Sequence, residues 1–331
     1  MVSEAPSAAS NLGRRRPSVS IIVPVYNGER TLSELCERIA SVLHECRRSF
    51  EILIVDDCSR DASWERTCEI VERMDRVRGF QLMRNFGQHN AVLCGIREAS
   101  YSVIVTLDDD LQNPPEEIPV LLEALTPGLD VVYGRPLGEQ HGFLRKCASV
   151  ITKQVLKSAM GVDVARNISA FRAFRTHLRD AFADYRGHLV SIDVLLTWAT
   201  TRFAAVPVKH EPRKAGQSNY TMRKLITHAL NMMTGFSTLP LQIASITGFA
   251  ATSFGILVLI YVIGRVLIQG IAVPGFAFLV CVIAIFGGAQ LFSIGIIGEY
   301  LGRMHFRTMD QPSYVLHKQV GPSSNQDEAE H

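Results

Sequence analysis

Three consecutive acids, Asp108, Asp109 and Asp110, directly follow an apolar run over residues 103–107. The β-branched composition of that run predicts a buried strand. The acids would then lie at its carboxyl end, which is the edge where open α/β sheets bind their ligands. Carboxylates this close repel one another, so a cation, or a ligand that carries one, is expected to hold them together. The alternative is a solvated acidic turn before a helix.

Two earlier segments place polar residues at strand ends in the same way. Residues 19–25 are predicted to form a strand that leads into a turn at Tyr26, and residues 50–55 a strand that leads into Asp56 and Asp57. Helical periodicity lies between the strands, which indicates a doubly wound, mostly parallel α/β sheet. Its carboxyl edge would gather these residues beside the acids, which favours the ligand site. The expected elements are strands over residues 19–25, 50–55, 80–82 and 103–107, and helices over residues 31–45, 62–73 and 90–98.

The chain lacks the glycine motifs of dinucleotide-binding folds and of P-loop enzymes. A bound nucleotide would therefore need another positive charge beside its diphosphate. A divalent cation at Asp110 could supply it, because carboxylate and diphosphate oxygens suit hard metals. The net charge of +2 does not suggest nucleic-acid binding. The seven cysteines form no C-x-x-C pair, which favours reduced, mostly buried thiols.

The carboxyl-terminal third is unusually apolar. No Asp, Glu, Lys or Arg occurs between Lys224 and Arg265, or between Arg265 and Glu299. Each gap exceeds the roughly 20 apolar residues that cross a bilayer, so we expect transmembrane helices over residues 239–263 and 275–298, with buried core helices as the alternative. Basic residues lie before the first span and after the second, and the positive-inside rule then places both termini in the cytoplasm.

The residues at the strand ends resemble a known family. Residues 23–27 (Val-Pro-Val-Tyr-Asn), 55–61 (Val-Asp-Asp-x-Ser-x-Asp) and 108–110 (Asp-x-Asp) are similar to those of the inverting, A-type family 2 glycosyltransferases. Residues 84–91 (Arg-Asn-Phe-Gly-Gln-His-Asn-Ala), residues 110–116 (Asp-Leu-Gln-Asn-Pro-Pro-Glu) and the two apolar spans narrow the resemblance to the polyprenyl-phosphate glycosyltransferases.

The resemblance implies a reaction and its partners. A sugar would pass from a nucleotide-sugar, with UDP favoured over GDP, to a polyprenyl phosphate such as undecaprenyl phosphate. The reaction would need Mg²⁺ or Mn²⁺, would invert the anomeric carbon, and would take place at the cytoplasmic face of the inner membrane. The product would donate its sugar in the modification of cell-envelope glycans.

The family pattern also implies roles for individual residues. Asp110 and Gln112 would bind the metal and Asp108 would face the nucleotide-sugar, whereas Asp109 would be a bystander, since relatives commonly carry a small neutral residue there. Asp56 could instead cap the following helix, Tyr26 could pack on the sheet edge, and any one arginine could be a surface residue. The nucleotide-sugar pocket would be lined by Pro24, Tyr26, Glu29, Asp56 and Asp57, and the donor and acceptor phosphates would be held by Arg135, Arg145 and Arg213.

The chemistry can also be argued from the acceptor. A lipid phosphate is ionised at neutral pH, so no strong base is needed to create the nucleophile. The demand is instead for a metal on the leaving diphosphate and for arginines that hold two anions close together. The basic segment over residues 209–221 precedes the membrane and would close over the donor, with a plain linker as the alternative.

Two positions depart from the family pattern. Relatives often carry a lysine where this chain has Asn219, and Lys214 or Arg223 would have to replace it. Relatives also often carry an acid shortly before the pair that matches Phe171 and Arg172, and here that acid is absent unless Asp163 or Asp193 reaches in. An obligatory carboxylate base is therefore in doubt.

The expected organisation leaves two other functions open. A processive polysaccharide synthase would usually carry a Gln-x-x-Arg-Trp motif and more spans, neither of which is present. A non-catalytic membrane scaffold would not need an intact Asp108, Asp110 and Gln112.

Glycines in the second span would allow a homo-oligomer. The expected parts are a disordered basic leader (1–17), a cytoplasmic glycosyltransferase domain (18–222), a juxtamembrane amphipathic segment (223–238), the two spans, and a cytoplasmic tail (299–331) that is disordered from Gln319 onward.

Overall fold

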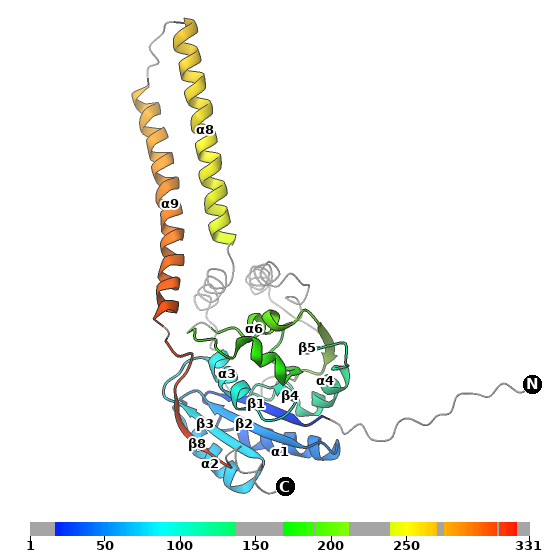
Figure 1. Cartoon of the computed structure of the whole chain (residues 1–331). Helices are drawn as coiled ribbons and strands as arrows, with labels where there is room; N and C mark the ends of the chain where they lie inside the picture. Colours follow the sequence, from blue (N-terminus) through cyan, green and yellow to red (C-terminus); the bar gives the residue numbers. More distant parts are fainter. Residues whose placement is uncertain are drawn as a thin grey trace, which may run out of the picture.

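The computed structural model describes residues 17–136, 168–187, 190–211, 239–269, 275–309 and 311–322. An α/β head carries one eight-stranded sheet, and two long helices extend side by side away from it (Figure 1). The first half of the head contains β1 (Val19–Val25), α1 (Leu32–Glu45), β2 (Phe50–Asp56), α2 (Ser63–Arg73), β3 (Val77–Leu82), α3 (Gln88–Glu98) and β4 (Val103–Thr106). The second half contains η1 (Pro115–Glu117), α4 (Ile118–Ala124), β5 (Val131–Pro136), β6 (Arg172–Arg175), η3 (Thr176–Phe182), α6 (Ile192–Ala199) and β7 (Phe203–Val208).

The strand order is β7-β5-β6-β4-β1-β2-β3-β8. The four central strands are parallel, because β1 pairs in parallel with both β2 and β4, and β2 pairs in parallel with β3. The prediction of a doubly wound parallel sheet is confirmed for this centre. Toward the edges the sheet is mixed, since β6 runs antiparallel to β4 and β5, and β8 (Leu316–Val320) runs antiparallel to β3.

The central strands are buried on both faces, which explains their continuous apolar sequence. All seven residues of β1 are buried. Ile21 packs into the core beneath α1 and α4, whereas Ile22 packs into the core beneath α3 and α6. Gly95 lets α3 approach β1 closely, because a Cβ there would lie 2.5 Å from Cγ2 of Ile22. Predicted and observed elements agree closely in this part, except that β3 begins at Val77, three residues before the predicted start.

Two helices, α8 (Leu239–Gln269) and α9 (Phe276–Thr308), occupy the two predicted spans and extend beyond both at their carboxyl ends. Both are long and apolar enough to cross a membrane, with mean hydropathy 2.2 over Pro240–Arg265 and 1.2 over Ile285–Gly302. Most of their described side chains are exposed or half-buried, with Ala244 as a buried exception. This exposure argues against the alternative of buried core helices, which would pack their apolar side chains inside the head.

The chain returns to the head after α9, which corrects the prediction of a disordered end from Gln319. Gln319 and Val320 belong to β8, which pairs with β3 in the register Gly79↔Val320 and Phe80↔Gln319. The open edge of β3 offers unpaired N–H and C=O groups, and an added strand satisfies them. Residues 1–16 of the predicted leader (1–17), the juxtamembrane segment and the end of the tail lie outside the described residues.

A short segment before β8, which we call the strap (Gln311–Val315), also contacts the head. Met83 N donates to Val315 O (2.9 Å), and the Arg97 guanidinium lies 5.5 Å from the centre of the Tyr314 ring. Ser313 is 3% exposed, and its Oγ donates to Tyr185 O (3.4 Å). The strap and β8 therefore fix the chain that leaves α9 to one side of the head.

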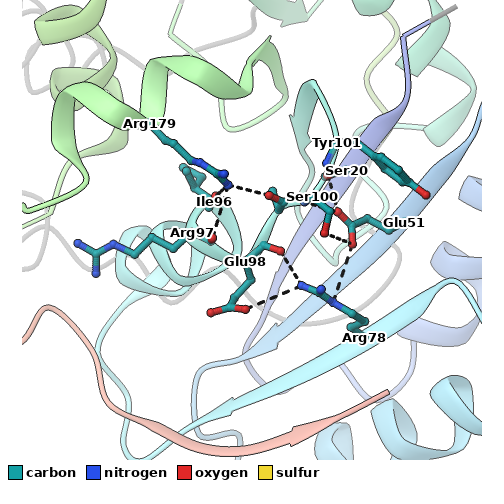
Figure 2. Close-up of polar contacts among 10 residues, drawn as sticks. Ser20, Glu51, Arg78, Ile96, Arg97, Glu98, Ser100, Tyr101 and Arg179 are labelled. Carbon is teal, nitrogen blue, oxygen red and sulfur yellow. Dashed lines mark hydrogen bonds and ion pairs between the residues drawn. The ribbon is translucent and has the colours of Figure 1, made fainter. Parts of the chain in front are cut away.

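A buried polar network closes the amino edge of the sheet (Figure 2). Ser20 Oγ and Ser100 N donate to Glu51 Oε1 at 2.6 and 2.7 Å. The Arg78 guanidinium lies 3.8 Å from Glu51 Oε2 and 3.9 Å from Glu98 Oε2, and it donates to Glu98 O at 2.6 Å. The start of three strands and the end of α3 are thus joined by charges of opposite sign.

Candidate active site

The turn after β1 is joined to the loop before α2. Asn27 N donates to Ser59 Oγ (3.0 Å), and Gly28 N donates to Ser63 Oγ (2.9 Å). Asn27 has a φ of 57°, a left-handed conformation that Asn adopts more readily than most residues. The ends of β1 and β2 therefore form one unit, and Tyr26, which is 41% exposed, lies at its surface.

Pro24, Tyr26 and Glu29 are close together in sequence at the end of β1, but their side chains have different surroundings. Pro24 is buried within the strand and Tyr26 faces solvent. The Glu29 carboxylate accepts a hydrogen bond from Ala62 N (3.3 Å), while Glu29 N donates to Asp61 Oδ2 (3.3 Å). The Glu29 side chain therefore turns toward the amino end of α2, where the helix dipole favours a negative charge.

Asp56 is fully buried at the end of β2. Its carboxylate accepts hydrogen bonds from Ser59 N (3.2 Å to Oδ1) and from Gln81 Nε2 (3.2 Å to Oδ2). Burial raises its pKa, and these hydrogen bonds oppose the rise. Because α2 begins four residues after Ser59, Asp56 holds the loop before the helix and does not cap the helix itself.

Asp57 is directed toward the loop after β3. Its two carboxylate oxygens accept hydrogen bonds from Phe86 N (2.7 Å) and Gly87 N (2.8 Å). Gly87 has a φ of 96°, a conformation that favours glycine. Burial raises the pKa of Asp57 to about 6, and the two backbone hydrogen bonds limit the rise. In this structure Asp57 therefore fixes the start of α3, and it was predicted to line the nucleotide-sugar pocket.

The acids after β4 lie at the carboxyl edge, beside the ends of β1 and β2. Asp108 Oδ1 accepts a hydrogen bond from Gln88 Nε2 (2.5 Å), and Asp110 Oδ1 accepts one from Gln112 N (3.1 Å). Leu111, between Asp110 and Gln112, is fully buried and has a φ of 59°. A leucine rarely adopts this conformation, and the turn it forms is a strained feature of the kind found at functional sites.

Asp109 has contacts that the prediction of a bystander does not account for. A Cβ built on Gly28 would lie 2.1 Å from Asp109 Oδ2, so the carboxylate covers that glycine. The pKa of Asp109 is raised to about 7, chiefly by burial and then by the charges of Asp108 and Asp110. Asp109 therefore connects the acidic loop to the turn after β1.

The segment after β7 closes one side of the acidic loop. Glu211 N donates to Gln112 O (2.8 Å), and His210 Nδ1 lies 3.4 Å from Asn113 Oδ1. These residues begin the basic segment that was predicted to close over the donor. The structure thus brings the start of that segment to the acidic loop, whereas residues 212–221, including Arg213, lie outside the described residues.

The three arginines predicted to hold phosphates are only partly covered by the structure. Arg135 is exposed near the end of β5, at the same edge of the sheet as the acids. Arg145 and Arg213 lie outside the described residues, and so does Asp163.

Asp193 takes part in a buried network behind the site. It pairs with the Arg172 guanidinium and accepts a hydrogen bond from Tyr133 Oη (3.0 Å). Arg172 Nε also donates to Thr106 Oγ1 (3.1 Å), at the end of β4. Because Asp193 is committed to this ion pair, the structure gives no support to Asp193 as the missing base.

Gln88, the first residue of α3, holds Asp108 through its side-chain amide, a role that was not predicted. The place of Gln88 in the motif over residues 84–91 was the available signal. The contacts by which Ser59 and Ser63 hold the turn after β1 were not predicted either. Their spacing after Asp56 and Asp57 could have indicated a loop built to bind a neighbouring backbone.

The donor set at this edge fits a divalent cation that is shared with a ligand. Among the described residues, no three His, Cys, Asp or Glu side chains gather as a complete metal site. Mg²⁺ commonly takes one or two protein carboxylates and completes its shell with water and substrate phosphates. Asp110, with the side-chain oxygen of Gln112 nearby in sequence, matches this partial set. The clustered negative charge that raises the pKa of Asp109 is the kind that a cation would offset.

Comparison with known proteins identifies the family of the chain. Residues 20–178 match glycosyl transferase family 2. The undecaprenyl-phosphate 4-deoxy-4-formamido-L-arabinose transferase of Proteus mirabilis is 34% identical over 316 residues, which cover 94% of this chain and 97% of that protein. The protein of the same name from Aeromonas hydrophila is 35% identical over 318 residues, with 94% and 97% covered.

A solved structure shows the same fold. The crystal structure of a mycobacterial protein matches with a TM-score of 0.50 and 15% identity, over 66% of this chain and 73% of that one. The curated relatives match over nearly their whole length at more than a third identity in the best case. The resemblance found in the motifs is thereby confirmed, and the chain belongs to glycosyl transferase family 2 and is a glycosyltransferase.

Proposed function

We propose that this enzyme transfers a sugar from a UDP-linked donor to undecaprenyl phosphate at the cytoplasmic face of the inner membrane. The observation that carries the proposal is the meeting of three strand ends, where Asp108 and Asp110 lie beside the turn that carries Tyr26. The curated relatives, at 34% and 35% identity, are named for transfer to undecaprenyl phosphate, and they support the same acceptor here. The sugar in their name, 4-deoxy-4-formamido-L-arabinose, is the first donor sugar to test.

The pocket for the nucleotide would be formed at the ends of β1 and β2. Tyr26 is exposed at this place and offers its ring to the base, with Pro24 beneath it in the strand. Asp56 would contact the base from the end of β2, and Glu29 would border the ribose. Asp57 supports the pocket through the loop over residues 86–87.

The proposed reaction brings two anions together, so its chief requirement is for groups that neutralise their negative charge. A Mg²⁺ or Mn²⁺ ion held by Asp110 and Gln112 would neutralise the leaving diphosphate. An oxygen of the ionised acceptor phosphate attacks the anomeric carbon, the bond to the diphosphate breaks, and the configuration inverts. No strong base is needed for this attack, which agrees with the commitment of Asp193 to Arg172. Arg135, with Arg145 and Arg213, would hold the two anions.

The membrane helices support the proposed location. Two crossings return a chain to the side from which it started, and the strap and β8 attach the chain that follows α9 to the head. The head and the chain end would then lie on one side, and the basic flanks favour the cytoplasm. The glycines of the second span leave room for a homo-oligomer, which stays a prediction.

The test is a transfer assay with the full chain in detergent or native membranes. Radiolabelled UDP-4-deoxy-4-formamido-L-arabinose and UDP-glucose would each be supplied with undecaprenyl phosphate, with and without EDTA. We expect a single-sugar glycolipid from one donor, lost with EDTA and restored by Mg²⁺ or Mn²⁺. Absence of metal-dependent glycolipid from every UDP-linked donor tested would overturn the proposal, and a polymeric product would indicate a processive synthase.

A further inference from the structure

We propose that Asp109 is a positioning residue, which fixes the turn after β1 against the acidic loop after β4, and that Gly28 is present because a side chain there would displace the Asp109 carboxylate from this contact. The proposal deepens the proposed function and rests on it for the role of the turn in donor binding. It replaces the prediction that Asp109 is a bystander.

The contact between the two segments is very close. A Cβ on Gly28 would lie 2.1 Å from Oδ2 and 3.0 Å from Cγ of Asp109, with Cγ1 of Val25 at 3.1 Å on another side. The Asp109 carboxylate therefore lies directly over the α-carbon of Gly28. The carboxylate is thus packed against the turn that carries Tyr26.

The turn after β1 cannot easily move away to make room for a larger residue at position 28. Gly28 N donates to Ser63 Oγ (2.9 Å), and Gly28 O accepts hydrogen bonds from Thr31 N (3.1 Å) and Leu32 N (3.2 Å). The last of these begins α1. Gly28 is thus fixed to α2 on one side and to α1 on the other, while Asp109 covers the remaining face.

The contact couples the two halves of the proposed donor site. Tyr26 stands two residues before Gly28, and Asp110 stands immediately after Asp109. A shift of the turn would displace the proposed base pocket relative to the proposed metal ligand. Loss of the Asp109 contact should therefore weaken donor binding and leave acceptor binding unchanged.

The test is a double-mutant cycle with the full-length protein in detergent, read by thermal unfolding and by kinetics. Gly28→Ala alone should lower the unfolding midpoint and raise the donor KM at least tenfold. Asp109→Ala alone should raise the donor KM several-fold, with the acceptor KM unchanged and kcat within about twofold. Because Asp109→Ala removes the obstructing oxygen, Gly28→Ala/Asp109→Ala should perform better than Gly28→Ala alone in both measurements.

Two further variants separate space from charge. Asp109→Asn keeps the size and an acceptor oxygen, so it should resemble the native protein alone and should fail to rescue Gly28→Ala. Gly128→Ala is the matched control, because nothing lies within 4 Å of a Cβ placed there, and it should change neither measurement. Rescue by Asn as complete as rescue by Ala would show that charge, and not space, couples the two positions, and would overturn the proposal.

The unfolding measurement keeps this test separate from that of the proposed function. Strictly additive changes of the unfolding midpoint in the cycle would overturn the coupling, whether or not the protein transfers sugar. If the native protein transfers no sugar, the proposed function fails, while rescue in the unfolding cycle would still establish the contact. A donor KM unchanged in Asp109→Ala would overturn the positioning role in an active enzyme.

Discussion

The two edges of the central sheet differ in the charges that they bring together: opposite charges meet at the amino edge, and like charges meet at the carboxyl edge. At the amino edge, Glu51 is 8% exposed and Arg78 is 5% exposed, and their opposite charges meet within 3.8 Å (Figure 2). At the carboxyl edge, the like charges of Asp108, Asp109 and Asp110 stand side by side, and Asp108 and Asp110 accept hydrogen bonds from Gln88 Nε2 and Gln112 N.

The difference distinguishes a structural network from a functional site. A buried charge with a partner of opposite sign is satisfied within the fold, so the amino edge needs no ligand. Burial, together with the neighbouring charges of Asp108 and Asp110, raises the pKa of Asp109, and such perturbed groups are typical of sites that bind a charged ligand. We therefore expect changes at the amino edge to affect stability and changes at the carboxyl edge to affect catalysis.

The largest effect is expected at the amino edge. Arg78→Ala would leave the Glu51 carboxylate buried without its cation, and removal of one partner of a buried pair typically costs about 3–5 kcal/mol. The unfolding free energy should fall by this amount, as measured by denaturant unfolding in detergent. The exposed Arg76 is the control, and Arg76→Ala should change stability little. A large loss of kcat in the folded protein would contradict the division between the edges.

At the carboxyl edge, Asp110→Ala should lower kcat/KM about 10²–10³-fold, because loss of a group that stabilises the transition-state charge has this effect. The unfolding midpoint should stay the same or rise, since one of three repelling charges is removed. The exposed Asp75 serves as a matched control, and Asp75→Ala should keep full activity. Equal losses of activity in Asp109→Ala and Asp110→Ala would remove the distinction drawn within the acidic loop.

A pH dependence should follow from Asp57, which also lies at the carboxyl edge. Its folded pKa of about 6 lies above the ordinary value of 3.8, so the folded state binds its proton more tightly than the unfolded state. The stabilisation is present below about pH 4 and is lost as the pH rises through about 6. The unfolding midpoint should fall by a few degrees over this window, and Asp57→Asn should flatten the fall. An identical slope in the variant would contradict the assignment.

The smallest effect should come from an ion pair at the surface. Arg38 of α1 contacts Glu116 at 2.6 Å, beside the acidic loop, with half of the Glu116 side chain exposed. Exposed pairs contribute about 0.2–1 kcal/mol and are screened by salt. Arg38→Ala should lower the unfolding free energy by less than 1 kcal/mol, and the difference should shrink in high salt. A loss as large as that of Arg78→Ala would mean that exposure does not decide the value of these pairs.

The central sheet and the location of the site could be predicted because both depend on local signals. Buried parallel strands such as residues 19–25 read as continuous apolar runs, and acids placed directly after a strand must lie at its carboxyl end. The orientation of side chains could not be predicted in this way. Asp56 and Asp57 are neighbours, yet one faces Gln81 and the other faces Gly87.

The edge of the sheet was beyond sequence reasoning for a different reason. The residues of β8 are polar and mostly exposed, so their pattern resembles a solvated tail. Their pairing with β3 depends on where α9 delivers the chain, which is a property of the whole fold. The contact between Asp109 and Gly28 likewise joins residues 81 positions apart in the sequence and leaves no local pattern.

The strap sets a limit on how far the head can stand from the end of α9. Only residues 309–312 separate Thr308, at the end of α9, from the docked Ser313. Five steps of at most about 3.6 Å give a connection of about 18 Å. If α9 crosses the membrane, as we propose, this short connection holds the head beside the bilayer. Lipid phosphates would then reach the head by two-dimensional diffusion, so turnover would depend on the surface density of the acceptor and not on its bulk concentration.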